Sequence, residues 1–140
     1  MNPEVTAAIA EIAASFPDAS VTSFPDAHGG AYVILEPVPL GHPYKQAGTW
    51  MGFHITAACP YADVYPHFVR EDLERMDGRA LGEGMGPGNQ FPPADAPGVT
   101  EEMRRKAIQI SRRANHRDPN GRLETPLIKL LKVLKWLMSR

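Results

Sequence analysis

The sequence has few of the features that mark secreted or membrane proteins. Among its 140 residues there is one cysteine, Cys59, which excludes an internal disulfide and agrees with a reducing compartment. No apolar run approaches the roughly 20 residues that a membrane-spanning helix needs. The first residues lack the basic start and apolar stretch of a signal peptide. We therefore expect a cytoplasmic protein without a membrane partner.

Motifs for metals and nucleotides are also lacking. The glycine-rich segment 82–88 has no Lys-Ser/Thr ending, which argues against a phosphate-binding loop. There is no cysteine pair, and no two histidines are spaced as i and i+4 on a helix. The histidines are spread singly along the chain: His28, His42, His54, His67 and His116. The sequence therefore predicts neither a metal site nor another cofactor.

The composition is typical of one globular domain over residues 1–140, with 43% apolar and 22% charged residues. The net charge of −1 hides an asymmetry, since residues 101–140 hold 11 Lys+Arg against 4 Asp+Glu and the first hundred hold 4 against 12. A basic half indicates an acidic protein partner or nucleic acid. Its bases are scattered with few aromatic residues between them, so we do not expect nucleic-acid binding.

The first seventy residues predict one helix followed by four strands. A cap, a proline and an acid at Asn2, Pro3 and Glu4 precede apolar residues at helical spacing, which predicts a helix over 3–15. The β-prone segments that follow are 20–23, 31–36, 50–57 and 68–69. Because the links between them are short, an antiparallel four-strand meander is the economical topology.

The next stretch, residues 77–98, holds six glycines and four prolines. A run this irregular inside a domain is either a functional flap or a flexible insertion. Residues 99–106 then predict one or two helical turns, and the alternation in 107–113 predicts a strand.

Thr125 and Pro126 predict the start of a final helix. Three lysines lie opposite its apolar face and are expected to be solvated: Lys129, Lys132 and Lys135. The apolar face itself is predicted to hold Leu127, Leu130, Leu131, Leu134, Leu137 and Met138. Trp136 lies beside the lysines and indicates either a partner contact or a covered domain edge.

This order of elements resembles ubiquitin-conjugating (E2, UBC-like) domains. Three short motifs carry the resemblance: Gly52-Phe53-His54-Ile55 is similar to the family's third strand, Pro60 with Tyr65-Pro66 to its proline–tyrosine–proline signature, and Thr125-Pro126-Leu127 to the helix after the active-site loop. The stretch ISRRANHRDPNGRLETPL is similar to the tail of divergent bacterial E2-like proteins. The resemblance implies an α+β, UBC-like fold and a pathway with an E1-type enzyme and a ubiquitin-like protein (Ubl) as partners. The same fold also serves inactive variants and RWD-type binding modules.

The chain departs from the E2 pattern at the catalytic residues. E2 enzymes carry a His-Pro-Asn triplet and then a nucleophilic cysteine, whereas this sequence has no such triplet and no cysteine after it. Asn89 is a weak counterpart of the triplet's asparagine and a possible oxyanion donor. Cys59 is the sole thiol, but it lies where the resemblance places no nucleophile, and an inert core cysteine is the favoured interpretation.

Ser111 is the sharper candidate for a nucleophile. It precedes Thr125 by 14 positions, close to the interval between nucleophile and helix cap in the E2 pattern. His116 is a candidate base oriented by Asp118, and Arg112 and Arg113 could stabilise an oxyanion or bind an acidic Ubl surface. The acyl product would be an oxyester. The alternative is that Ser111 lies on an edge strand or loop and that His116 and Asp118 cap a turn.

Three functions therefore remain open. The first is an E2-type transferase that accepts a Ubl C-terminus on Ser111 or Cys59. The second is a non-catalytic adaptor that holds E1 or Ubl through the first helix, Trp136 and the basic C-terminal half. The third is an unrelated small α+β binding domain.

Overall fold

The computed structural model describes residues 1–113, 117 and 120–140, and both predicted helices form in it. Helices α1 (Pro3–Ser15) and α2 (Pro126–Met138) each begin at a proline, whose fixed φ suits the first helical position. The Thr125 hydroxyl accepts a hydrogen bond from the Ile128 N–H, so the predicted cap of α2 is confirmed. Asn2 occupies the predicted N-cap position of α1, but its side chain makes no capping hydrogen bond. Its side-chain amide donates to the Ala57 carbonyl at 3.3 Å and fixes the helix start against the sheet.

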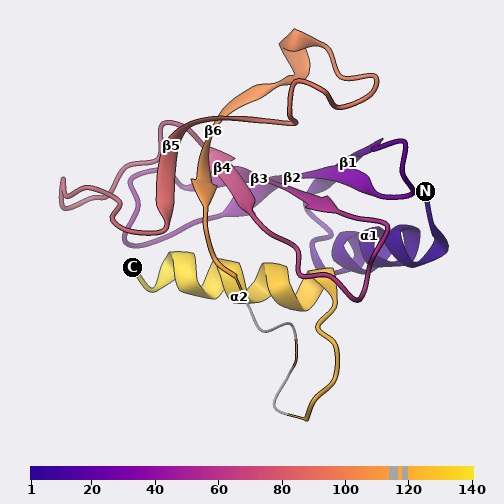
Figure 1. The fold of residues 1–140 in the computed structure, drawn as a ribbon. Coiled ribbons are helices and arrows are strands. Elements are labelled where there is room, and N and C mark those ends of the chain that lie inside the picture. Colours follow the sequence, from indigo (N-terminus) through magenta and orange to yellow (C-terminus); the bar gives the residue numbers. More distant parts are fainter. Residues whose placement is uncertain (114–116, 118–119) are drawn as a thin grey trace.

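One antiparallel sheet of six strands lies above the two helices (Figure 1). The strands are β1 (Ser20–Pro25), β2 (Ala31–Pro39), β3 (Gly48–Ile55), β4 (His67–Arg70), β5 (Met85–Phe91) and β6 (Arg105–Ile110). Their spatial order is β1-β2-β3-β4-β6-β5. The predicted α+β class is confirmed. The predicted four-strand meander is wrong, because β6 pairs with β4 and carries β5 at the edge.

Strand β5 lies inside the segment that the sequence predicted to be irregular. Its sequence MGPGNQF is poor in β-forming residues, so the strand depends on its partner β6. The pairing shifts register between Gly86 and Asn89, where the Asn89 amide donates to the Gly86 carbonyl at 3.0 Å. The helical turns predicted over 99–106 shrink to one 3₁₀ turn, Glu101–Met103, because β6 already begins at Arg105.

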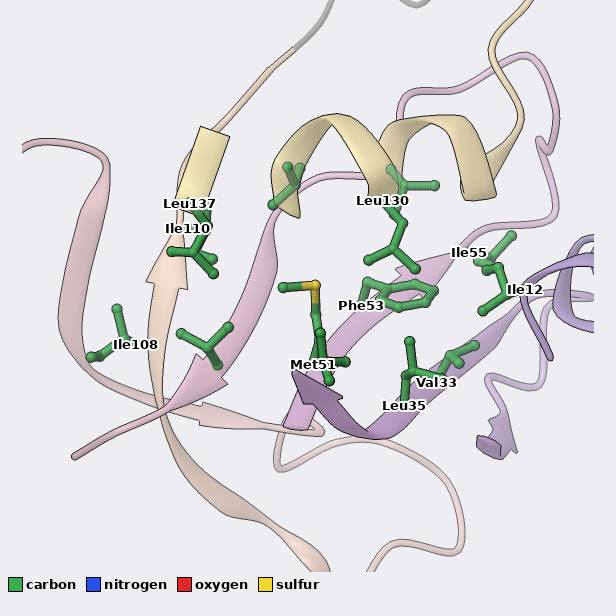
Figure 2. Close-up of a cluster of buried hydrophobic side chains, with 14 of the residues drawn as sticks. Ile12, Val33, Leu35, Met51, Phe53, Ile55, Ile108, Ile110, Leu130 and Leu137 are labelled. Carbon is green, nitrogen blue, oxygen red and sulfur yellow. The ribbon is translucent and has the colours of Figure 1, made fainter. Parts of the chain in front are cut away.

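The main core lies between one face of the sheet and both helices. Figure 2 shows Leu130 and Leu137 of α2 facing Met51 and Phe53 of β3, all of them fully buried. The predicted apolar face of α2 is wrong at two positions, since Leu131 is 47% exposed and Met138 is 37% exposed. The buried residues of α2 recur at helical spacing: Pro126, Lys129, Leu130, Val133 and Leu137. Neither this helix nor any other in the described part of the chain is long and apolar enough to cross a bilayer.

The opposite face of the sheet carries a smaller aromatic cluster around Phe91, the last residue of β5. The Phe91 ring lies 5.0 Å from the Phe68 ring and 6.4 Å from the Trp50 ring, measured between centroids. The backbone of Gly52 lies beneath Phe91, and a Cβ added there would approach Phe91 Cδ1 to 2.4 Å. Gly52 is therefore needed for this cluster to close.

We expect Gly52→Ala to destabilise the fold by about 1–3 kcal/mol, because the added methyl group overpacks against Phe91. Urea denaturation would measure the free energy of unfolding. In a Phe91→Leu background the same substitution should cost less, since the ring is gone. Gly86→Ala is the matched control, because nothing lies within 4 Å of a Cβ there. An equal cost of Gly52→Ala in both backgrounds would contradict the role given to Phe91.

Candidate functional site

The only thiol of the chain lies apart from the other predicted catalytic residues. Cys59 follows β3, is 8% exposed and lines a cavity of about 170 Å³ together with Glu4 and Pro126. Burial raises the pKa of the Cys59 thiol, and the nearby carboxylate of Glu4 raises it further. Among the described residues, no cation lines this cavity to favour a thiolate. The environment of Cys59 therefore favours an inert thiol.

Ser111 is the first residue after β6 and is exposed. Its N–H donates to the Gly84 carbonyl at 2.8 Å, and its hydroxyl accepts from Gln109 Nε2 at 3.3 Å. The predicted base His116 and its partner Asp118 lie outside the described residues, so their roles remain predictions. Asn89 pairs with Ala107, four residues before Ser111, which is about 13 Å along a strand. The structure does not bring Asn89 to the Ser111 hydroxyl.

The predicted partner-binding residues do come together at the end of β6. The Arg112 guanidinium lies 4.9 Å from the centre of the Trp136 ring, and the Arg140 guanidinium lies 4.4 Å from the same ring. Arg113 lies over the Tyr65 ring at 3.9 Å. All three contacts are cation–π arrangements, which hold the charged groups in place without neutralising them.

A set of buried charges lies beside these arginines, and the sequence analysis missed it. Lys129 was expected to be solvated, but its side chain is only 3% exposed and Nζ donates to both carboxylate oxygens of Asp63 at 2.8 Å. Lys132 binds the carboxylate of Glu124, whose side chain is fully buried. The burial of Lys129 could have been suspected from its position next to Leu130, at the border of the buried stripe of α2. The loop that carries Asp63 covers that border.

Four cationic side chains line one small cavity between β6 and α2. Arg112, Arg113, Lys129 and Lys132 surround about 90 Å³, with Val133 as the apolar wall. We call this the cationic pocket. The Asp63 and Glu124 carboxylates are bound to its two lysines. Within the described residues, neither arginine has a carboxylate partner, and each lies over an aromatic ring instead.

His67 lies in the core next to these charges. It is fully buried on β4, opposite Ile110 of β6, and its ring lies 5.4 Å from the Phe53 ring. Neither ring nitrogen has a hydrogen-bond partner among the described residues. Burial lowers the pKa of His67 to about 3, and the Lys129 ammonium contributes in the same direction. The imidazole is therefore neutral at pH 7.

A second histidine is held by a carboxylate on the other face of the sheet. His54 Nε2 lies 2.7 Å from Asp26 Oδ2, and the His54 ring stacks on Tyr32 at 4.2 Å. The Asp26 carboxylate also accepts hydrogen bonds from the N–H groups of His28 and Gly30. Burial opposes ionisation, but these hydrogen bonds, led by the one to His54, lower the pKa of Asp26. The arrangement fastens the β1–β2 turn to β3.

The chain matches no protein-family model, no curated protein and no solved structure at a significant level. In the described ranges, no three His, Cys, Asp or Glu side chains gather as a metal site. The function is therefore inferred from the geometry of the cationic pocket and from the E2 resemblance.

We expect Asp63→Asn to destabilise the fold by about 3 kcal/mol, because it leaves the Lys129 ammonium buried without its carboxylate. Lys129→Met should cost less, since a thioether of similar length tolerates burial and Asp63 is partly exposed. Urea denaturation of both variants and of the double variant measures the coupling. The control is Glu74→Gln, in the exposed pair with Lys45, which should change stability by about 0–1 kcal/mol. Equal small losses in all three single variants would show that the Lys129 pair is solvated.

The buried His67 predicts a loss of stability on acidification. Its pKa is about 6.5 in the unfolded chain and about 3 in the folded one, so only the unfolded chain binds a proton between these values. The contribution of neutral His67 to the free energy of unfolding is complete above pH 6.5. It falls as the pH drops, by about 2–3 kcal/mol between pH 7 and 4.5. Denaturation at several pH values should show this loss in the wild type and in His42→Gln, whose histidine is exposed. His67→Leu should lack it. The same pH dependence in His67→Leu would assign the effect to another group.

Proposed function

We propose that the chain is an E2-like component of a bacterial Ubl conjugation pathway that holds a protein partner without forming a covalent bond to it. The architecture supports this in part. Helix α1 precedes a run of four neighbouring antiparallel strands, and α2 follows the irregular segment, as in a UBC-like domain. Strands β5 and β6 would then be additions to that fold.

The observation that carries the proposal is the grouping of Arg112, Arg113 and Trp136 at the end of β6 and along α2. Two exposed arginines held by aromatic rings suit an acidic protein surface or a carboxylate, because a guanidinium edge offers paired donors. Arginine and tryptophan are also the residues that contribute most often to binding energy at interfaces. The resemblance supplies the partner, a Ubl or its E1-type enzyme.

Among the described residues, the surroundings of both possible nucleophiles favour a binding role over transfer. The Cys59 thiol is buried and its pKa is raised. The Ser111 hydroxyl has Gln109 as its partner, and a serine needs an adjacent base to react near pH 7.

The second candidate is transfer through Ser111, favoured by the exposure of that residue next to Arg112. In this reaction Ser111 Oγ would attack the acyl carbon of a Ubl–E1 thioester. The E1 thiolate would leave, and the hydroxyl proton would pass to a base, for which His116 is the predicted residue. The product would be a Ubl oxyester.

The test is to incubate the protein with an E1-type enzyme and a Ubl from the same genome, with ATP, and then to analyse complexes by size-exclusion chromatography and non-reducing gels. We expect co-elution with E1 or Ubl and no covalent adduct. The double variant Arg112→Glu/Arg113→Glu should weaken binding more than 10-fold, because charge reversal repels an acidic partner. Lys106→Glu makes the same kind of change at an exposed residue outside the cationic pocket and should have little effect.

The gel distinguishes the alternatives. An adduct that resists thiol reductant, is released by hydroxylamine and is absent in Ser111→Ala would establish the oxyester route instead. An adduct that is lost to reductant and absent in Cys59→Ala would make Cys59 the nucleophile. If the gel shows no adduct and chromatography shows no co-elution, a role in such a pathway is refuted.

A further inference from the structure

The cationic pocket has the composition of a binding site for a negatively charged group. Among the described residues, two guanidiniums, two ammonium groups and the apolar side chain of Val133 line a single cavity. Like charges brought this close repel one another, so their grouping favours anions among them.

The carboxylates nearby neutralise only part of this charge. Asp63 binds Lys129 with both oxygens, and Glu124 binds Lys132. Within the described part of the chain, each lysine of the cavity has one of these acids as its ion-pair partner, whereas the guanidiniums of Arg112 and Arg113 lie over aromatic rings. A ring contact does not use up the five N–H donors of a guanidinium, so Arg112 and Arg113 can still donate hydrogen bonds to an anion.

The size of the cavity limits what can enter. About 90 Å³ is the volume of roughly three liquid water molecules, which admits one compact oxyanion such as a carboxylate or a phosphate group. The rings of Trp136 and Tyr65 lie next to the cavity, and Arg112 and Arg113 lie over them. A nucleobase could not stack on the ring faces that these arginines cover. A protein ligand fits better than a nucleic acid.

We propose that the cationic pocket binds a compact oxyanion, namely a carboxylate carried at the end of a peptide. Its identification as part of a protein partner rests on the proposed function, whereas oxyanion binding itself does not. A terminal carboxylate fits because its two oxygens match the paired N–H donors at the edge of a guanidinium. Inorganic phosphate offers the same chemistry and is the alternative source.

The experiment is an NMR titration of the ¹⁵N-labelled full chain at constant ionic strength, following the Nε–Hε signals of Arg112 and Arg113. The probes are the peptide Ac-Ala-Ala-Gly-Gly with a free carboxylate, the same peptide as its C-terminal amide, and inorganic phosphate. We expect saturable shifts with the free carboxylate and at least 10-fold weaker binding of the amide. If phosphate binds more tightly than the carboxylate peptide, the source of the oxyanion is phosphate and the peptide assignment is wrong.

The variant Arg113→Gln should weaken binding of the carboxylate peptide at least 10-fold. Arg113 is exposed, so the fold should survive the change, and Lys106→Gln is the control that should bind as the wild type does. The proposed oxyanion pocket would be refuted by any of three results. These are equal shifts with the free carboxylate and the amide, shifts that do not saturate, and unchanged peptide binding by Arg113→Gln. Peptide binding without co-elution of E1 or Ubl would refute the proposed function and leave the oxyanion pocket standing. Co-elution with E1 or Ubl without peptide binding would refute the oxyanion pocket and leave the proposed function standing.

Discussion

The contact between Lys129 and Asp63 is the constraint on which the functional side of the domain depends. An ammonium group with 3% exposure is stable only when a carboxylate lies against it, and Asp63 supplies both oxygens. Asp63 lies in the proline-rich segment between β3 and β4, whereas Lys129 lies on α2. The pair therefore joins that segment to the helix, and both lysines of the cationic pocket take their positions from α2.

The same constraint explains the neutral histidine beneath the pocket. A charged imidazole at His67 would place a second buried cation next to Lys129, and burial already opposes its ionisation. Keeping His67 neutral allows one ammonium to remain in the core with one carboxylate. The guanidiniums of Arg112 and Arg113 lie outside this core, and both residues are exposed and therefore accessible to a ligand.

The sequence was informative where local chemistry decides the structure. Proline at the first helical position and the Thr125 cap predict α1 and α2 correctly, and β-branched and aromatic runs predict β2 and β3. It failed at β5, because a strand rich in glycine and proline forms only through its long-range pairing with β6. It also failed at Lys129, since helical spacing alone does not reveal a loop that brings Asp63 over the side of a helix. The cationic pocket combines residues from β6's end and α2, so only the tertiary structure could reveal it.

The two faces of the sheet leave different opportunities for binding. On one face, Phe91 closes over Gly52 and fills the space between Trp50 and Phe68 with aromatic packing. On the other face, α1 and α2 cover the core (Figure 1). The thiol is enclosed beneath this second layer, where burial disfavours the thiolate that transfer chemistry requires. At the end of β6, by contrast, positive charge meets solvent beside a preformed cavity. In the proposed role, the domain would hold an anionic partner at this cavity rather than react with it.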